Sequence, residues 1–410
     1  MTKGVATYIA SDPHPGVPRL DVDPFSEAFL ADPYSHHENL RAAGPVFWLE
    51  PYRIYGSARH AEVSAALKDY ETFCSARGVG LADFAREEPW RSKSLLLEAD
   101  PPLHTRTRGM MNKVVTLAAL MKELPLWQEK ADQLVDELLQ RRSFDAVTDL
   151  AEVYPMRVFP DLIGLPPEGR DNLVPYGTAT FNAFGPRNAL FEETMRDAKD
   201  AMLWVASSCK RENLADEAWG AKVYRTAEAE DCSPAEAELL VRSFLTAGLD
   251  TTINGIAHLM LALASHPDQW RKLQANPSVL VKNAFEESLR WDSTVQTFFR
   301  TTTREVEFGG AVIPKDAKII LFLGAANRDP RRWNDPESFD VERQAAGHVG
   351  FGFGIHQCLG QMIARREAEA VLKALVSRVA DIRITGATSR RLNNTLHALS
   401  HLPVEITALP

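Results

Sequence analysis

The chain has 410 residues, of which 45% are apolar and 25% charged, and its formal net charge is −9 at pH 7. Such a length allows a large buried core, whereas the acidic balance argues against a nucleic-acid partner. No stretch approaches the roughly 18 apolar residues of a membrane span, and residues 1–20 lack the cationic and apolar segments of a secretory signal. No linker divides the chain, so we expect one cytoplasmic domain over residues 1–410.

Helical periodicity dominates the chain. Residues 125–142 carry apolar side chains at helical spacing. A much longer helix is expected to begin at Ser233, a good N-cap, with Pro234 in its first position and Glu236 completing a capping box. It is expected to end just before Pro267. Because this helix is apolar on several faces, it is predicted to cross the interior of the molecule.

The pattern changes after the next helix, which covers residues 275–292. Residues 304–324 hold β-branched residues in short runs, with Gly309 and Gly310 between two of them. This predicts a hairpin and a further strand. The whole pattern indicates a mainly α fold with a minor β part, whose β-rich stretches are about residues 45–60 and 300–325.

Four cysteines are scattered along the chain without a C-x-x-C pair, which indicates neither a disulfide framework nor a zinc site. Cys74, Cys209 and Cys232 are interpreted as small core or surface residues. Cys358 differs, because it stands in FGFGIHQCLG directly before a helical pattern over residues 359–379. A helix start offers a dipole and free N–H groups that stabilise a thiolate, which is a soft ligand for iron. Taken alone, such a cysteine is more often a buried structural residue beside a glycine-rich turn.

The neighbours of Cys358 favour an iron ligand. Phe351, Gly354, His356, Cys358 and Gly360 fit the pattern F-x-x-G-x-[HR]-x-C-x-G. Glycines here permit tight turns and close approach to a flat cofactor. The chain resembles the cytochrome P-450 superfamily over nearly its whole length, and this pattern is the superfamily's haem-ligand signature. The resemblance implies the cytochrome P-450 fold, with a long central helix over haem b. It makes Cys358 the thiolate ligand of the iron, with Phe351 and Gly360 beside the cofactor.

A second motif supports the resemblance. Glu287 and Arg290 lie one turn apart on a helix, a spacing that on its own is typical of a surface ion pair. In the superfamily such a pair is buried and is closed by an arginine from a later loop. PESFDVER resembles that loop and makes Arg343 the third member, although Val341 stands where the superfamily often has proline.

Basic residues from separate segments form the next set. His104 and Arg108 are four residues apart and share one helical face, which alone indicates a basic surface stripe. The resemblance implies that they hold the haem propionates together with Arg300 and His356. Four such donors suit two carboxylates chemically.

The middle of the long helix contains AGLDTT, residues 247–252, although glycine, aspartate and threonine are poor helix formers. A threonine hydroxyl that turns back onto a carbonyl opens a helix locally, and small Ala247 and Gly248 would let a flat ligand and O2 approach. A polar kink without chemistry is the alternative. The resemblance implies that Asp250 and Thr251 are the acid–alcohol pair that delivers protons to the oxygen bound at the iron.

Helical spacing also bears on the substrate. Ser243, Ala247 and Thr251 are four residues apart and share a face, so Ser243 lies about 12 Å from Thr251 along the helix. With Arg242 beside it, Ser243 would bind one end of a flat aromatic acid, while the other end lies near the iron. An equally good interpretation is that both residues face solvent or another helix.

A closer resemblance is to the bacterial subgroup that oxidises para-substituted benzoates, typically 4-methoxybenzoate O-demethylases. It is carried by PWRSKSLLLEADPPLHT, ATFNAFGPRN, VRSFLTAGLDTT, STVQTFFRTTTR and RRLNNTLHALSHLP. The resemblance implies a carboxylate site made by Arg91, Ser94, Arg242 and Ser243. It also implies an apolar slot for the ring, made by Leu97, Phe181, Phe184, Ala247, Val295 and Phe298.

Electrons are expected from an iron–sulfur ferredoxin and its NADH-dependent flavin reductase, which soluble bacterial members of the superfamily use. Arg106, Lys113, Arg365 and Arg366 form either a basic docking patch for it or an ordinary solvated surface. We expect a monomer with no nucleic-acid or membrane partner. A peroxide-driven peroxygenase, a non-enzymatic haem carrier or sensor, and a metal-free helical interaction protein are the alternative functions.

Overall fold

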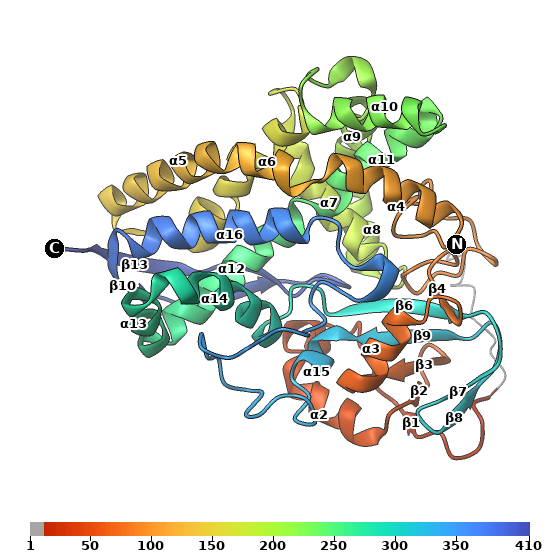
Figure 1. Cartoon of the computed structure of the whole chain (residues 1–410). Coiled ribbons are helices and arrows are strands. Elements are labelled where there is room, and N and C mark those ends of the chain that lie inside the picture. The colour runs from red at the N-terminus through yellow and green to blue at the C-terminus, as the bar shows by residue number, and fades with distance from the viewer. Residues whose placement is uncertain (1–11) are drawn as a thin grey trace.

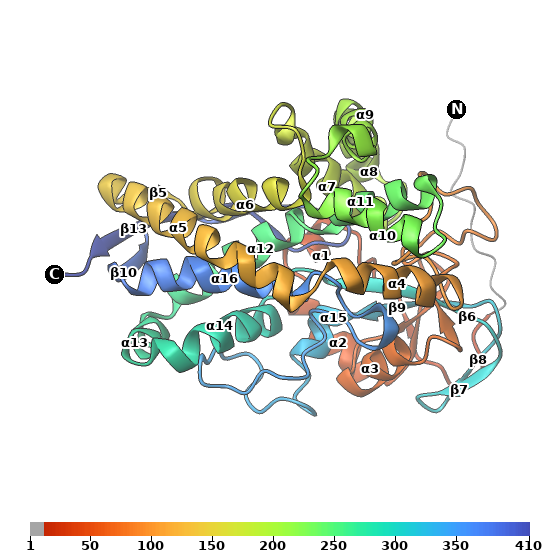
Figure 2. The same cartoon turned by 45° about the horizontal axis from the view of Figure 1, so that its top comes forward.

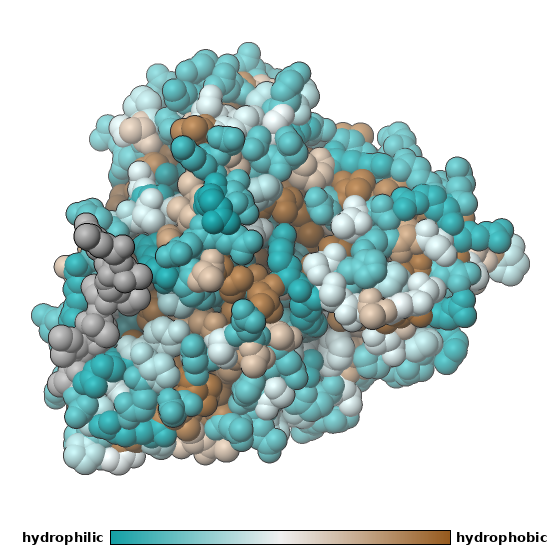
Figure 3. Space-filling view, turned by 180° about the vertical axis from the view of Figure 1, so that it is seen from behind, coloured by the Kyte–Doolittle hydropathy of each residue, from teal (hydrophilic) through white to brown (hydrophobic). Residues whose placement is uncertain are grey.

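The computed structural model describes residues 12–410, so residues 1–11, part of the segment tested for a secretory signal, lie outside it. Helices fill most of the molecule, and a β-rich part lies below them in Figure 1. The prediction of a mainly α fold with a minor β part is confirmed. The face shown in Figure 3 is largely hydrophilic, with separate hydrophobic patches. None of the described helices has the length and apolar character needed to cross a bilayer.

Helices occupy most of the chain between residues 27 and 376. The α-helices of the described residues are α1 (Glu27–Ala31), α2 (Tyr34–Ala43), α3 (His60–Lys68), α4 (Leu103–Val114), α5 (Leu117–Arg141), α6 (Val153–Ile163), α7 (Leu173–Asn182), α8 (Ala189–Asp197), α9 (Lys199–Ser208), α10 (Trp219–Ala229), α11 (Pro234–Ala247), α12 (Asp250–Ser265), α13 (Pro267–Ala275), α14 (Pro277–Trp291), α15 (Leu323–Asn327) and α16 (Gln361–Val376). Short 3-10 turns cover Arg170–Asn172, Arg211–Asn213 and Gly354–His356, and a π-helix covers Ala146–Ala151.

The strands form small sheets. The largest has the order β1 (Arg19–Leu20), β2 (Phe47–Leu49), β3 (Ile54–Ser57), β9 (Lys318–Phe322), β6 (Thr297–Thr302) and β4 (Phe73–Cys74). A second has the order β10 (Val379–Ile384), β13 (Pro403–Ala408) and β5 (Ser143–Asp145). Two hairpins pair β7 (Val306–Phe308) with β8 (Ala311–Ile313) and β11 (Ser389–Arg391) with β12 (Ala398–His401). Gly309 and Gly310 turn the predicted hairpin with φ angles of 59° and 78°.

The long helix predicted from Ser233 is present but broken. Ser233 caps α11 and forms the predicted capping box with Glu236. The helix stops at Ala247 and resumes as α12 at Asp250, so the prediction of one continuous helix is wrong. α12 is almost entirely buried and ends before His266. Since α12 also packs against α7 and α14, the predicted path through the interior is confirmed.

Helix α5 begins earlier than the apolar pattern indicates. Thr116 caps it by accepting a hydrogen bond from Ala119, and Pro125 lies inside the helix rather than at its start. A proline inside a helix removes one hydrogen bond, which is why the pattern is read as beginning there. α5 packs along α16 in Figures 1 and 2, and both contribute to the largest apolar core together with α12 and α14.

The predicted ion triad is confirmed. Arg290 donates to both carboxylate oxygens of Glu287 at 2.7 and 2.8 Å, and both side chains are fully buried. Arg343 donates to the same carboxylate at 3.0 Å. Arg290 also donates to the carbonyl oxygens of Asn327 and Pro336. The triad therefore ties α14 to the segment that leads to the predicted iron ligand, and a surface ion pair is excluded.

Candidate active site

Cys358 lies in a tight loop before α16. Its N–H donates to the carbonyl oxygen of Phe351 at 2.9 Å, which closes the loop. Gly352 and Gly354 have φ angles of 66° and 71°, a region that favours glycine. A side chain on Gly354 would also collide with the carbonyl of Leu67. Backbone conformation and packing against α3 therefore hold the sulfur in place.

The thiol of Cys358 faces groups that favour its anion. Burial raises its pKa, against the lowering effect of the N–H groups of Gly360 and Gln361 and of the cations Arg108 and Arg365. A thiolate is the form that binds a metal. The remaining cysteines are buried and carry no disulfide, as predicted for small core residues: Cys74, Cys209 and Cys232.

The residues predicted to hold the propionates meet beside this loop. The rings of His104 and His356 face each other with centroids 4.5 Å apart. Arg300 is buried on β6. Burial and the nearby Arg300 lower the pKa of His356, against the raising effect of Asp100. Arg108 acts on the Cys358 thiol as Arg300 does on His356. One group of donors thus stands next to the sulfur.

Only His356 of this set has an acidic partner among the described residues, since its Nε2 lies 3.5 Å from a carboxylate oxygen of Asp100. Burial, and then the neighbouring His356 and Arg108, lower the pKa of His104 to about 4. Burial lowers the pKa of Arg300 to about 10. Among the described residues Arg108 and Arg300 form no ion pair, and Nε2 of His104 is buried without a hydrogen-bond partner. Buried donors without acceptors fit an anionic group, so the residues present fit a haem and its two carboxylates.

Two threonine hydroxyls stabilise the break between α11 and α12. Thr251 donates to the carbonyl of Ala247 at 2.6 Å, and Thr252 donates to that of Gly248 at 3.0 Å. The predicted local opening is confirmed. Ala247 is exposed, whereas a side chain on Gly248 would collide with Phe159. Ala247 therefore lies on the accessible face with Thr251 one turn further on, and packing against Phe159 explains the glycine at 248.

Asp250 occupies a separate, buried polar site. Its carboxylate accepts hydrogen bonds from Thr178 at 3.2 Å, Asn254 at 3.0 Å and Arg391 at 3.2 Å. Gly177 leaves room for it, since a side chain there would press against Asp250. Burial raises the pKa of Asp250, against the lowering effect of Arg391, Thr178 and Asn254. A raised pKa favours the protonated form of a carboxyl group.

The serines predicted at the carboxylate end come together. The hydroxyl oxygens of Ser94 and Ser243 are 3.5 Å apart. The oxygen of Ser94 also accepts from the N–H groups of Leu96 and Leu97, which leaves its proton for a further acceptor. Arg242 donates at 2.6 Å to the carbonyl two residues before Ser94. Ser243 and Arg242 therefore contact the segment of residues 92–94, which excludes the alternative that they face only solvent or another helix.

Arg91 joins this group but is not a free cation. Its Nη1 pairs with Glu98 at 3.2 Å, and both side chains are buried. Glu98 also accepts from the N–H of Ser94 at 2.7 Å. The Nε and Nη2 atoms of Arg91 are buried without a hydrogen-bond partner. Sequence reasoning missed Glu98, because nothing in its spacing from Arg91 marks it as the partner.

Most of the predicted slot residues belong to one apolar cluster. The ring centroids of Phe181 and Phe184 are 5.8 Å apart at 83°, and Phe298 lies 6.0 Å from Phe184. Leu97 and Val295 pack against the same cluster. Ala247 is not a member, although it lies on the exposed helix face described above. The cluster also contains residues that were not predicted to line the slot: Val79, and Leu396 and Ala398 from the stretch RRLNNTLHALSHLP.

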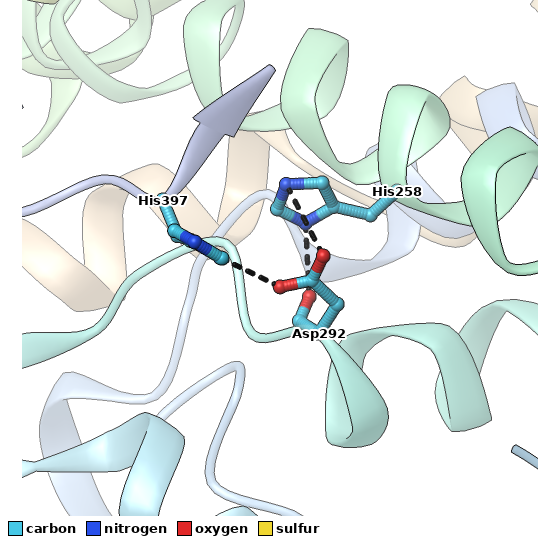
Figure 4. A group of neighbouring side chains, drawn as sticks. All are labelled: His258, Asp292 and His397. Carbon is cyan, nitrogen blue, oxygen red and sulfur yellow. Dashed lines mark hydrogen bonds and ion pairs between the residues drawn. The ribbon is translucent and has the colours of Figure 1, made fainter. Parts of the chain in front are cut away.

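Figure 4 shows a buried polar cluster outside the slot. His258 from α12, Asp292 at the end of α14, and His397 place candidate ligand atoms within 4.8 Å of one another, a spacing that also suits a metal ion. His397 shares a hydrogen bond with the Asp292 carboxylate at 2.8 Å, and His258 shares one with its backbone carbonyl at 2.9 Å. His397 directly follows Leu396 of the slot.

Other partners show that this cluster is a hydrogen-bonded brace. Tyr34 donates to one carboxylate oxygen of Asp292 at 3.2 Å, and Arg390 donates to the other at 3.0 Å. Burial would raise the pKa of Asp292, but His258, Arg390 and His397 hold it well below its ordinary value. Both carboxylate oxygens are engaged, and a guanidinium already balances the charge, so the contacts favour a brace over a metal centre.

Comparison with known proteins agrees with this geometry. Residues 188–380 match the family model described as cytochrome P-450. The chain is 52% identical over 393 residues to cytochrome p450 CYP199A2 of Rhodopseudomonas palustris. This similarity covers 96% of this chain and 95% of that protein. It is 31% identical over 420 residues to the cytochrome P-450 monooxygenase PikC of Streptomyces venezuelae, covering 94% of each.

Solved structures are similar as well. Epothilone D-bound cytochrome P-450 epoK matches with a TM-score of 0.84 at 28% identity, over 95% of this chain and 99% of that one. Cytochrome P-450 CREJ in complex with (4-ethylphenyl) dihydrogen phosphate matches with a TM-score of 0.85 at 25% identity, over 94% and 99%. Both similarities extend over nearly the full chain.

Proposed function

Because the chain belongs to the cytochrome P-450 family of haem b monooxygenases, we propose that it oxidises the para substituent of small aromatic carboxylic acids, with 4-methoxybenzoate O-demethylation as its reaction. One observation carries this proposal: an apolar slot lined by Phe181, Phe184 and Phe298, together with a hydroxyl pair from Ser94 and Ser243. The similar protein CREJ, in complex with (4-ethylphenyl) dihydrogen phosphate, supports a para-substituted aromatic anion as the substrate class.

The donors near Ser94 suit a carboxylate. Ser94 would turn its hydroxyl proton from Ser243, and Ser243 would turn its own from the carbonyl of Leu239, to which it donates at 3.0 Å. Both hydroxyls would then donate to the carboxylate. The unpartnered nitrogens of Arg91 add charge-assisted donors. Glu98 pairs with Nη1 of Arg91, so the positive charge that remains at this end of the slot comes from Arg242, and Nε and Nη2 of Arg91 act as hydrogen-bond donors.

The aromatic slot would orient the ring. A ring packed against Phe181, Phe184 and Phe298 has little freedom once its carboxylate is held. We propose that only the para substituent then reaches the exposed helix face of Ala247 and Thr251.

The cofactor would be held by residues already described, with Cys358 as the thiolate that would bind its iron and His104, Arg108, Arg300 and His356 at its carboxylates. When bound, haem supplies the oxidising power that inserts one atom of O2 into a C–H bond and leaves the other as water, with two electrons and two protons consumed. The hydroxylated methoxy group is a hemiacetal, which loses formaldehyde and leaves 4-hydroxybenzoate.

Protons would reach the reacting oxygen through Asp250 and Thr251. Arg391 touches buried Asp250 while 38% of its own side chain is exposed, so it links the carboxyl group to the solvent side. Thr251 donates its hydroxyl proton to the Ala247 carbonyl, so its oxygen is free to accept a hydrogen bond. It would pass a proton on once the hydroxyl turns away from that carbonyl. We expect Thr251→Ala to keep haem and substrate binding but to lower the product formed per NADH. A variant with full product per NADH would contradict the role of Thr251.

The predicted ferredoxin patch needs revision. Arg106 pairs with Glu236, Lys113 with Glu230, Arg365 with Glu286 and Arg366 with Glu369, so the four basic residues do not form an open positive surface. A hollow of 370 Å³ between α5, α14 and α16 is lined in part by Leu117, Val279, Lys282 and Met362. We propose that an iron–sulfur ferredoxin docks over this mixed surface, reduced by an NADH-dependent flavin reductase, and that the enzyme acts as a cytoplasmic monomer.

Spectroscopy and product analysis test the proposal. The purified protein should show the thiolate-type carbon monoxide difference spectrum. Titration with 4-methoxybenzoate should shift the haem to high spin, and the 2- and 3-methoxy isomers should shift it weakly. Turnover with NADH, reductase and ferredoxin should give formaldehyde and 4-hydroxybenzoate in equal amounts.

Other outcomes favour the other functions. Equal spin shifts for all three isomers contradict the end-on arrangement of the acid. Product with peroxide alone indicates a peroxygenase, and bound haem without product indicates a carrier or sensor. Purified protein without haem colour indicates a metal-free interaction protein.

A further inference from the structure

Two walls of the slot come from distant parts of the chain that meet at buried asparagines. Phe181 lies on α7 and Phe184 just beyond its end, whereas Leu396 lies in the loop between β11 and β12. Asn182 directly follows Phe181, and Asn394 lies two residues before Leu396. Each asparagine is at most 2% exposed.

Asn394 connects these walls directly. Its backbone N–H donates to the side chain of Asn182 at 2.8 Å, and its side-chain amide donates to the Asn182 carbonyl at 3.0 Å. The side-chain amides of Asn188 and Asn394 exchange two further hydrogen bonds, at 2.8 and 3.1 Å. Gly185 completes the fit, because a side chain there would collide with Asn394. Asn182, Asn188 and Asn394 are called the asparagine clamp below.

The loop that carries Leu396 is fixed in the same way. Asn393 accepts from the N–H groups of Thr395 and Leu396, each at 3.0 Å, and donates to the carbonyl of Thr178 on α7 at 3.2 Å. Leu396 then pairs with Val295 in a β-bridge. Hydrogen bonds, which are directional, therefore set the distance between Leu396 and α7, whereas apolar contact alone is non-directional.

We propose that the asparagine clamp sets the width of the slot and so selects para-substituted rings, with Asn394 as the positioning residue. This inference rests on the proposed function, because it concerns the same slot. Asn394 acts through Phe181, Phe184 and Leu396 rather than on the substrate. If the clamp loosens, the two walls separate and a ring with a meta substituent fits.

Asn394→Asp is the sharpest variant. It keeps the shape of the side chain and the oxygen that accepts from Asn188, but it replaces the donating NH2 with an oxygen. That oxygen faces the carbonyl of Asn182 and the side-chain oxygen of Asn188, so two hydrogen bonds become repulsive contacts. Asn394→Ala removes all side-chain bonds without repulsion. Asn283→Ala is the matched control, because Asn283 donates to the carbonyls of Val341 and Arg343 and lies outside the slot.

The experiment compares spectral dissociation constants for 4-methoxybenzoate and 3-methoxybenzoate in the holoenzyme. The para-to-meta preference should fall about tenfold in Asn394→Asp and less in Asn394→Ala. It should stay unchanged in Asn283→Ala even if thermal stability falls equally. Amide hydrogen exchange at Thr395 and Leu396 should accelerate only in the clamp variants. An unchanged preference with lowered stability would show that the clamp is merely structural and overturn the proposal.

A second probe separates this inference from the proposed function. Phenylimidazoles bind haem iron through nitrogen and place a ring near it without a carboxylate. If the wild-type protein binds no methoxybenzoate, the proposed substrate class fails, and the clamp is then judged with 4-phenylimidazole and 2-phenylimidazole. Loss of discrimination between these two isomers in Asn394→Asp supports the clamp, and equal discrimination in both proteins overturns it.

Discussion

The cofactor side and the substrate side of the candidate site are built in different ways. FGFGIHQCLG is one continuous stretch, and its glycine conformations and backbone hydrogen bonds already hold Cys358. The slot opposite gathers side chains from segments as distant as Val79, Phe184 and Ala398. Backbone geometry specifies one side and side-chain packing the other. Substitutions on the cofactor side should therefore change the carbon monoxide spectrum, whereas substitutions on the substrate side should change ligand binding.

The largest effect is expected at the sulfur. Cys358→His should abolish product formation, because an imidazole lacks the electron-donating character of a thiolate that favours O–O cleavage. The carbon monoxide difference band should move away from the thiolate position, while the slot keeps its shape. Cys232→Ser, at a buried cysteine of another region, is the control and should keep the wild-type band. A wild-type band in the histidine variant would show that Cys358 is not the iron ligand.

The next largest effect concerns the support of the cofactor side. Arg290→Ala leaves the fully buried carboxylate of Glu287 with one arginine fewer. Breaking a buried ion pair costs about 3–5 kcal/mol, measurable as a lower free energy of unfolding in urea. Arg383→Ala breaks the exposed pair with Glu405 and should cost less than about 1 kcal/mol. Similar losses in both variants would mean that the triad does not support the fold.

Features that depend on short motifs were predicted better from the sequence than features that depend on long-range contacts. The capping box of Ser233 and Glu236 and the triad of Glu287, Arg290 and Arg343 follow from short motifs, and the structure contains them. Local signals of this kind need only neighbouring residues or a recognised loop. The helix opening at AGLDTT was expected, yet the full break was not, because its extent depends on hydroxyl contacts with carbonyls and on packing at Phe159.

The residues of the slot were predicted from the resemblance, whereas the contacts between them are seen only in the structure. Glu98 pairs with Arg91, and Leu396 pairs with Val295, but neither contact leaves a periodic signal. The asparagines that join α7 to the loop before β12 lie in ATFNAFGPRN and RRLNNTLHALSHLP, but nothing in the sequence indicates that these two stretches contact each other. Long-range side-chain contacts of this kind exist only once both segments have folded together.

A third prediction tests the brace outside the slot by pH. Burial lowers the pKa of His258 to about 4, below its ordinary 6.5. Between these values the unfolded chain binds a proton that the folded chain does not, so stability falls as pH drops from about 6.5 to about 4. The loss amounts to roughly 3 kcal/mol. His258→Gln should lack this part of the pH dependence in urea unfolding measured at a series of pH values.

Asp292 titrates in a different pH range, so the pH dependence of stability between pH 6.5 and 4 can be assigned to His258. Asp292 has its pKa held well below its ordinary 3.8, so its contribution to stability is lost only at pH values below about 3.8. Equal pH dependence in wild type and His258→Gln between pH 6.5 and 4 would mean that the brace does not keep His258 neutral.

The smallest effect is expected at the carboxylate end of the slot. Ser243→Ala removes one hydroxyl while Ser94 and the free nitrogens of Arg91 remain, so binding of 4-methoxybenzoate should weaken only about tenfold. Binding of 4-methoxytoluene, which has no carboxylate, should not change, and the carbon monoxide band should stay at its wild-type position. Spin-shift titration of both ligands measures this. If binding of 4-methoxytoluene weakens equally, Ser243 contributes to packing rather than to carboxylate binding. If the variant loses haem, the cofactor side and the substrate side do not act independently.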